Sequence, residues 1–371
     1  MKTKLKYLVL IGVVLQVFLT SCQTAENTTT PRSVIPTTES ITPPAGNNTT
    51  VQPESTDPLS RSEFMLGALC TIRLYDNKSE EILEKVFARI AEIEERVSSN
   101  AEGTDVDEIS KNAGIQKVQV SDDTIAIIKK GLEFAGLSDG AFDITIGPLV
   151  RLWNIGFDDA RVPEQHEIDA VLGLINSDDI EINEDENTVF LKRKGMRLDL
   201  GAVAKGYVAD EVAKVLRENG SESAIIDLGG NIYTVGSKGD RPWVIGIQDP
   251  FDRRGAYVGT VRYSNKSFVT SGVYERYLEQ DGVFYHHLLN PHTGYPFENN
   301  IAGVTIVSDY SVDGDALSTV AYSKDVETGL EMIETLENIE AIFVTLDRNV
   351  YISSGLRNNF ILEDDTYKLQ Y

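Results

Sequence analysis

The sequence predicts an α+β protein in which mixed and antiparallel sheets pack against helices. Two observations favour this fold class. Stretches with the alternating pattern of strands cluster in hairpins, and they do not alternate strictly with the helical stretches. The chain of 371 residues also carries no internal repeat and no heptad pattern.

The first half of the chain predicts two long helices and several strands. Apolar residues recur at helical spacing in both helices, and a serine stands at the N-cap of each. The expected order is a strand over Glu63 to Tyr75, a helix over Ser79 to Val97, a helix over Ser121 to Leu137, a loop and short apolar turn over Gly140 to Val150, and two strand halves around Gly195 within Val189 to Leu200.

The second half predicts three more helices among short strands. The first of these helices ends at Asn219-Gly220, a usual C-terminal signal. The expected helices are Val203 to Glu218, Asp313 to Ala321 and Val326 to Leu336, and the expected strands lie within Ser223 to Val235, Trp243 to Asp249, Ala256 to Tyr263, Lys266 to Thr270, Glu275 to Leu278, Glu340 to Leu346 and Val350 to Ser353.

The front of the chain is typical of an exported bacterial lipoprotein. Three lysines precede an apolar run from Tyr7 to Leu19, which is too short to span a bilayer as a mature helix, and Leu19-Thr20-Ser21-Cys22 matches a lipobox. We therefore expect a signal peptide over 1–21 and a lipid on Cys22, which would hold the protein at the membrane outside the cytoplasm. A plain secretory signal with a chance cysteine is the alternative.

A flexible tether and one folded domain are expected to follow. Residues 22–58 are dominated by Thr, Pro, Asn, Ser and Glu, and such a segment has too little to bury to offset its ordering entropy. The folded domain is expected over 59–371. The net charge of -24 argues against nucleic acid and anionic lipid as partners. With Cys22 lipidated, Cys70 is expected to be a core residue without a disulfide.

Three segments carry candidate chemistry. Leu198 to Tyr207 (L-D-L-G-A-V-A-K-G-Y) predicts a strand, a glycine turn and a helix start, a place to hold phosphate or metal. Tyr285 to Pro296 contains three of the four histidines at poor spacing for zinc, and it suits general acid or base work better. Asp315 and Thr319 are spaced i, i+4, so one helix face would offer Mg²⁺ two hard oxygens. Each segment has a structural alternative: a capped corner, a hairpin with surface histidines, and an N-capping Asp with a Thr bonded to its own helix.

Seven stretches in order give the chain a family resemblance. They are F-M-L-G (64–67), G-A-F-D-I-T-I-G-P-L-V (140–150), L-D-L-G-A-V-A-K-G-Y (198–207), D-L-G-G-N (227–231), T-S-G-V-Y-E-R (270–276), H-H-L-L-N-P-H-T-G-Y-P (286–296) and D-A-L-S-T (315–319). On these motifs the chain resembles the ApbE family of FAD:protein FMN transferases over essentially all of 64–362, which implies an ApbE-like, T-fold-related architecture.

The resemblance implies a set of site residues. Met65, Ala141, Phe142, Asp143, Asp199, Lys205 and the backbone around Leu288 would contact FAD, and Mg²⁺ would be held by the carbonyl of Ala202 and the side chains of Asp315 and Thr319. The implied reaction is attack by a Thr or Ser hydroxyl of an acceptor flavoprotein on the FMN-side phosphorus of FAD, which releases AMP. We expect His287 to be the base, with His286 on the opposite, surface side of its strand.

One departure from the family pattern bears on the activity. Where the family usually has an aromatic after the first helix, this chain has Asn100 in Ser98-Ser99-Asn100. Asn100 cannot stack on the nucleotide, so water could compete with the acceptor and hydrolyse FAD to FMN and AMP. The alternatives to the transferase are therefore a Mg²⁺-dependent FAD pyrophosphatase and a lipoprotein that only binds FAD.

Overall fold

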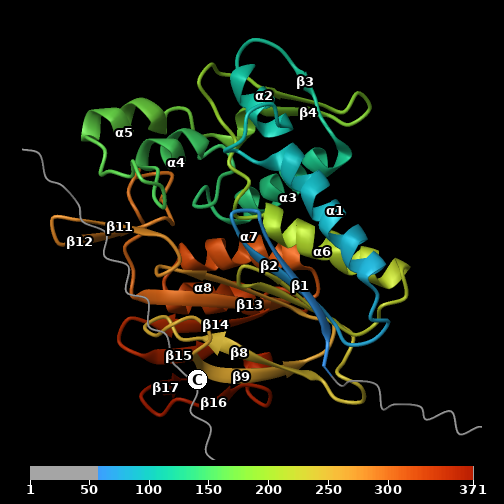
Figure 1. Ribbon diagram of the computed structural model, residues 1–371. Coiled ribbons are helices and arrows are strands. Elements are labelled where there is room, and N and C mark those ends of the chain that lie inside the picture. Colours follow the sequence, from blue (N-terminus) through green and yellow to red (C-terminus); the bar gives the residue numbers. More distant parts are fainter. Residues whose placement is uncertain (1–56, 371) are drawn as a thin grey trace, which may run out of the picture. The chain divides into compact units, whose positions relative to one another are not determined.

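The computed structural model describes residues 57–370 (Figure 1). The predicted signal peptide, Cys22 and nearly all of the predicted tether lie outside these residues and stay predictions. Within the described part of the chain, no helix is long and apolar enough to cross a membrane.

A nine-stranded sheet forms the centre of the fold, in the order β1-β2-β6-β7-β10-β13-β14-β15-β17. Neighbouring strands are antiparallel except for the parallel pair β15 and β17, which confirms the predicted sheet type. The strands are β1 (Leu59–Met65), β2 (Ala68–Leu74), β6 (Ala224–Leu228), β7 (Asn231–Val235), β10 (Ser267–Gly272), β13 (Ile301–Ser308), β14 (Glu340–Thr345), β15 (Asn349–Ile352) and β17 (Lys368–Gln370).

Three smaller sheets surround this one. One packs on the large sheet, because Trp243 and Val261 share a buried apolar cluster with Phe268 and Val307 of the large sheet. The small sheets are β16-β9-β8, made of β8 (Trp243–Gln248), β9 (Tyr257–Tyr263) and β16 (Ile361–Leu362); β3-β5-β4, made of β3 (Val118–Gln119), β4 (Ile180–Asn183) and β5 (Thr188–Leu191); and the hairpin of β11 (Tyr277–Gln280) with β12 (Val283–His286).

Helices cover the other face of the large sheet (Figure 1), and a second apolar cluster lies between them and the strands. Amphipathic spacing places one side of each helix in this core; α1, for example, buries Ile82, Val86, Ile90 and Ile93. The helices are α1 (Glu80–Val97), α2 (Asp105–Lys111), α3 (Asp122–Leu137), α4 (Gly147–Trp153), α5 (Gln165–Leu172), α6 (Ala204–Glu218), α7 (Ser311–Tyr322) and α8 (Val326–Glu334), with short 3₁₀ turns at Ser177–Asp179 and Ser354–Leu356.

The predicted helices are confirmed, with some differences of detail. Ser121 caps α3 as expected, because its Oγ accepts a hydrogen bond from the Thr124 N–H at 3.2 Å. Ser79 stands at the N-cap of α1 but makes no such bond. The prediction of a strand over Met196 to Leu200 is wrong, since the segment has only an isolated bridge between Arg197 and Ile146.

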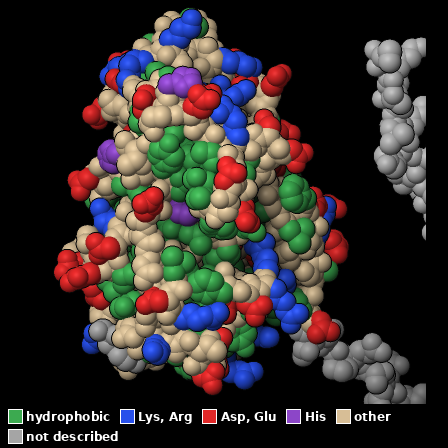
Figure 2. Space-filling view, turned by 90° about the vertical axis from the view of Figure 1, so that its left-hand side faces the viewer, with side chains coloured by type: hydrophobic (Ala, Val, Ile, Leu, Met, Phe, Trp, Pro, Cys, Tyr) green, Lys and Arg blue, Asp and Glu red, His purple; other side chains and the backbone are tan. Residues whose placement is uncertain are grey.

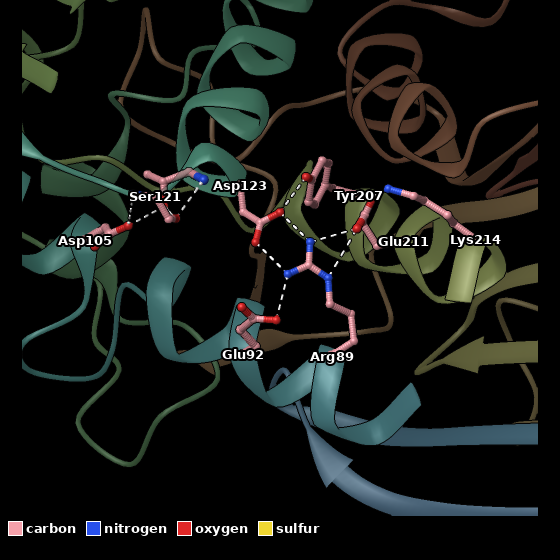
Figure 3. Close-up of polar contacts among 9 residues, drawn as sticks. Arg89, Glu92, Asp105, Ser121, Asp123, Tyr207, Glu211 and Lys214 are labelled. Carbon is pink, nitrogen blue, oxygen red and sulfur yellow. Dashed lines mark hydrogen bonds and ion pairs between the residues drawn. The ribbon is translucent and has the colours of Figure 1, made fainter. Parts of the chain in front are cut away.

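An ion-pair network joins three of the helices (Figure 3). The Arg89 guanidinium of α1 donates to both oxygens of Asp123 in α3, at 2.8 and 2.6 Å, and to Glu211 Oε2 of α6 at 2.7 Å. Tyr207, also in α6, donates its hydroxyl to Asp123 Oδ1 at 2.6 Å. Burial opposes the charge on Asp123, but the hydrogen bonds from Arg89 and Tyr207 hold its pKa below the ordinary value. The network fixes α6 against α1 and α3.

Candidate functional site

The corner at Leu198 to Tyr207 connects an extended segment to α6. The Asp199 N–H donates to the Ile144 carbonyl at 2.8 Å, which ties this corner to the loop that follows α3. Asp199 Oδ1 accepts the Gly201 N–H at 2.9 Å. Burial raises the pKa of Asp199, although the hydrogen bond from Gly201 and the charges of Arg276 and Lys205 act in the opposite direction.

The start of α6 lies against α7 at an unusually close contact. The Gly206 N–H donates to Asp315 Oδ2 at 2.9 Å, and a Cβ at Gly206 would lie 2.4 Å from the Ser311 carbonyl oxygen. In a regular helix that N–H would donate to the carbonyl of Ala202, four residues earlier. The described residues provide no hydrogen bond to the Ala202 carbonyl. The contact therefore places Asp315 beside the helix start and leaves a backbone oxygen available there.

Asp315, Lys205 and Thr319 lie around this contact. Asp315 is 3% exposed, and its Oδ1 is 3.8 Å from Lys205 Nζ. Thr319 is partly exposed in a helix whose other residues are nearly all buried, and its Oγ1 is 3.4 Å from Ser271 Oγ. The carboxylate, the hydroxyl and the free carbonyl are all hard oxygen donors, so this donor set fits Mg²⁺ with water and phosphate as further ligands. Among residues 57–370 there is no cluster of three or more His, Cys, Asp or Glu side chains that suits a metal.

Asp210 connects α6 to α7 a second time. Its two carboxylate oxygens accept the N–H groups of Ser311 and Val312, at 2.8 and 2.9 Å, and so cap the N-terminus of α7. Burial raises the pKa of Asp210 to about 7 against these two hydrogen bonds. Gly206 and Asp210 are one helical turn apart, so the same side of α6 holds α7 at both points.

The two adjacent histidines differ from expectation in one respect. The prediction that His286 is a surface residue is wrong, because it is 7% exposed and its Nε2 lies 2.9 Å from the Phe297 carbonyl oxygen. The other side of the hairpin is covered there by Phe297 and Tyr322, whose hydroxyl is 3.3 Å from the same nitrogen. His286 Nδ1 accepts the Leu288 N–H at 3.3 Å, so His286 serves the packing of this loop.

His287 has the geometry of a base. Its Nδ1 lies 3.1 Å from the Arg276 carbonyl oxygen, to which only an N–H can donate. The neutral ring therefore carries its proton on Nδ1 and has its Nε2 lone pair free. Burial lowers the pKa of His287 to about 4, with the charges of Arg276 and Lys205 acting in the same direction. The ring is thus unprotonated at neutral pH.

Most of the remaining predicted FAD residues belong to the apolar cluster between the helices and the large sheet, and Asp143 and Asn100 do not. Met65, Ala141, Phe142, Ala202 and Leu288 all belong to it or pack against it. The two carboxylate oxygens of Asp143 accept the N–H groups of Thr145 and Ser177, at 2.7 and 2.9 Å, so its side chain orders the loop. Asn100 is exposed in the loop after α1, where its own N–H donates to Ser98 Oγ at 3.4 Å. The FAD and Mg²⁺ roles of these residues stay predictions.

Sequence reasoning missed two polar residues of the site. Asp210 follows the L-D-L-G-A-V-A-K-G-Y motif by three positions, and its spacing from Gly206 was the signal that both face one neighbour. Arg276 closes the T-S-G-V-Y-E-R motif, and its charge reaches both Asp199 and His287. The signal that could have identified Arg276 was its positive charge at the end of a motif in a strongly acidic chain.

The β11–β12 hairpin presents an apolar surface next to His287. Tyr277 and Phe284 stack with ring centroids 4.4 Å apart, and both rings are about half exposed. Figure 2 shows hydrophobic side chains gathered in the middle of this face of the molecule. A pocket of about 240 Å³ opens beside the hairpin and is lined by Phe284, His286, Phe297, Ile301, Tyr322 and Leu346, among others. None of the predicted FAD or Mg²⁺ residues lines it.

Comparisons with known proteins agree with the fold and the motifs. The model of the ApbE family matches residues 66–343. A Klebsiella pneumoniae protein named FAD:protein FMN transferase is 39% identical over 310 residues, which is 84% of this chain and 96% of that protein. A Treponema pallidum protein of the same name is 34% identical over 331 residues, 84% of this chain and 91% of its own length.

Solved structures give the same result. The crystal structure of the ApbE protein from Thermotoga maritima has a TM-score of 0.75 at 28% identity and covers 81% of this chain and 99% of its own. The flavin transferase ApbE from Vibrio cholerae has a TM-score of 0.73 at 26% identity, covering 82% and 99%. On the matched sequence model, the relatives and the shared architecture, this chain belongs to the ApbE family.

Proposed function

We propose that this protein transfers FMN from FAD to a Thr or Ser hydroxyl of an acceptor flavoprotein in a Mg²⁺-dependent reaction that releases AMP. The names of its relatives support flavin transfer. The observation that supports a metal dependence is the hydrogen bond from the Gly206 N–H to Asp315, because it holds a buried carboxylate at the start of α6, where the Ala202 carbonyl has no hydrogen bond from the described residues. The finer roles of the residues follow from their chemistry.

Ala202, Asp315 and Thr319 would hold the metal, through one carbonyl, one carboxylate and one hydroxyl. When bound there, Mg²⁺ would neutralise charge on the pyrophosphate oxygens and on the leaving AMP. Lys205, whose Nζ is 3.8 Å from Asp315 Oδ1, adds a second positive charge on the same side. A site that only stored FAD would need no such donor set at the pyrophosphate.

His287 would activate the acceptor hydroxyl. Its free Nε2 takes the hydroxyl proton while the hydroxyl oxygen forms a bond to the FMN-side phosphorus, and the bond from that phosphorus to the AMP phosphate breaks. The hydrogen bond from Nδ1 to the Arg276 carbonyl holds the ring in the tautomer that can accept this proton. General base catalysis of this kind contributes about 10²- to 10⁴-fold.

Hydrolysis of FAD is the second candidate activity, and Asn100 favours it. The side chain at this position is short, polar and exposed, so it leaves the nucleotide side of the site open to water. Water in place of the acceptor hydroxyl gives FMN and AMP. We expect this reaction alongside transfer, and we expect Asn100→Tyr to suppress it.

One assay separates the three functions. The protein is incubated with FAD, Mg²⁺ and a candidate acceptor, and the acceptor mass is measured together with AMP. An increase in acceptor mass by one FMN group, with an equal amount of AMP, supports transfer. Release of AMP when no acceptor is present supports hydrolysis. If neither AMP nor modified acceptor forms, the protein only binds FAD. Asp315→Ala should abolish turnover and its Mg²⁺ dependence. A variant that keeps full turnover would contradict the metal site.

We also propose that the protein is a lipoprotein anchored outside the cytoplasm. The lipobox ending at Cys22 and the polar segment behind it support this. Cys22→Ala should release the protein from the membrane fraction and remove the lipid from its measured mass. Unchanged membrane association in that variant would contradict the proposal.

A further inference from the structure

Arg276 lies between two glycine turns at the site. A Cβ placed on Gly67 would be 3.4 Å from Arg276 Nη2, and one placed on Gly156 would be 3.1 Å from Arg276 Cδ. The guanidinium therefore lies over the turn between β1 and β2, while its stem passes the loop after α4. Both glycines have positive φ angles, +68° and +96°, which are unfavourable for a larger residue.

The guanidinium has no partner within residues 57–370. Its side chain forms no hydrogen bond and no ion pair there, and the residue is exposed. The chain as a whole carries 58 acidic residues against 34 basic ones, and arginines such as Arg89, Arg161 and Arg193 are paired with carboxylates. An arginine left unpaired in such a protein has its five N–H donors available to an anion.

Arg276 is also fixed to the candidate base. Its carbonyl oxygen accepts both the backbone N–H and the Nδ1–H of His287, each at 3.1 Å. Its positive charge acts on Asp199 as well, where it favours the ionised carboxylate. The free guanidinium and the free Nε2 of His287 are therefore held together at the base of the β11–β12 hairpin.

We propose that Arg276 binds the pyrophosphate of the flavin dinucleotide, with its planar guanidinium donating to phosphate oxygens. A guanidinium matches a phosphate with two parallel N–H bonds, which a lysine cannot reproduce. Because the Arg276 backbone holds the candidate base His287, we expect this charge to lie near the phosphorus that the acceptor hydroxyl attacks. This inference rests on the proposed function for the identity of the ligand, but its test needs no turnover.

The test compares flavins with and without phosphate. Equilibrium binding of FAD, FMN and riboflavin is measured by flavin fluorescence with Mg²⁺ present, for the wild type, Arg276→Met, Arg276→Lys and the control Arg262→Met. Arg262 is an exposed arginine on β9, in a sheet away from the site. We expect Arg276→Met to weaken FAD and FMN by about 10- to 100-fold and riboflavin by less than about threefold. Arg276→Lys should restore only part of the loss, and Arg262→Met should bind all three normally.

Two results would overturn the inference. One is FAD affinity in Arg276→Met that stays within about threefold of the wild type. The other is an equal loss of affinity for riboflavin, which would mean that Arg276 only shapes the pocket. The melting temperature of each variant is measured as a control, and an unchanged value excludes general unfolding. Failure of the proposed function would give a different result. The wild type would then bind FAD but transfer no FMN, and Arg276→Met would still weaken FAD and FMN more than riboflavin.

Discussion

Replacing Gly206 with Ala tests whether the contact between α6 and α7 positions the candidate metal site. The new Cβ would lie 2.4 Å from the Ser311 carbonyl oxygen, 2.6 Å from the Val312 Cα and 2.7 Å from the Ser311 carbonyl carbon. All three are backbone atoms, so no side chain can rotate away. Ordinary contact needs about 3.4 Å, and the helices must therefore separate by about 1 Å.

The expected loss of stability combines two destabilising effects with one stabilising effect. Overpacking of this kind costs about 1 to 3 kcal/mol, and loss of the bond from the Gly206 N–H to Asp315 adds about 1.5 to 3 kcal/mol. Alanine favours a helix over glycine by about 1 kcal/mol. We expect a net loss of about 1.5 to 5 kcal/mol in the free energy of unfolding. Displacement of Asp315 by about 1 Å should lower FMN transfer by about 100-fold.

Gly136→Ala is the matched control. Gly136 lies in the last turn of α3, and a Cβ there meets no atom within 4 Å. This variant should keep full activity and gain up to about 1 kcal/mol of stability. Denaturant unfolding and the Mg²⁺ concentration for half-maximal transfer are measured for both. A Gly206→Ala protein with wild-type stability and wild-type Mg²⁺ response would refute the positioning role of this contact.

Three further predictions concern the charged groups. Arg89→Met should destabilise the protein by about 2 to 4 kcal/mol, because it leaves the largely buried Asp123 carboxylate without its ion-pair partner. Adding Asp123→Asn should recover part of the loss in denaturant unfolding. The kcat/KM should fall as pH drops through about 4, because His287 then takes up a proton. If the residual activity of His287→Gln falls over the same pH range, His287 is excluded as the base. Asp210→Asn should lower the free energy of unfolding by about 1 to 3 kcal/mol near pH 4. The difference from the wild type should shrink as pH rises to about 7, because the raised pKa of Asp210 makes the folded wild type lose stability over that range. A difference that grows with pH would contradict the raised pKa.

The sequence predicted the helices well because each buries one side. Ile82, Val86 and Ile90 of α1, for example, lie on its single buried face, so apolar residues recur in the sequence with the 3.6-residue period of a helix. Strand β13 (Ile301–Ser308) was not predicted, since all eight of its residues are buried and both of its faces meet protein. A strand covered on both sides has no alternation to detect. The helices α2 and α5 were missed too, because their seven and eight residues are too few to show a clear helical period.

The error over His286 has a related cause. Alternation along β12 correctly placed the two adjacent histidines on opposite sides, but the sequence gives no sign of which side is covered. Tyr322, which lies 36 residues further along the chain, packs edge-on against His286 with ring centroids 5.5 Å apart. Such long-range contacts decide burial, and they depend on how β12 and α7 meet in the folded protein.

The segment from Ala204 to Glu211 shows how one motif combines ligand and scaffold positions. Two i, i+4 pairs divide the surface of α6: Gly206 and Asp210 hold α7, while Tyr207 and Glu211 bind the Asp123 and Arg89 pair. Lys205 remains on the side that faces Asp315. A motif of this kind is specific because its scaffold residues fix the helix in two directions. Substitutions at Gly206 or Tyr207 should therefore lower the transfer activity, although neither removes a group that contacts the substrate.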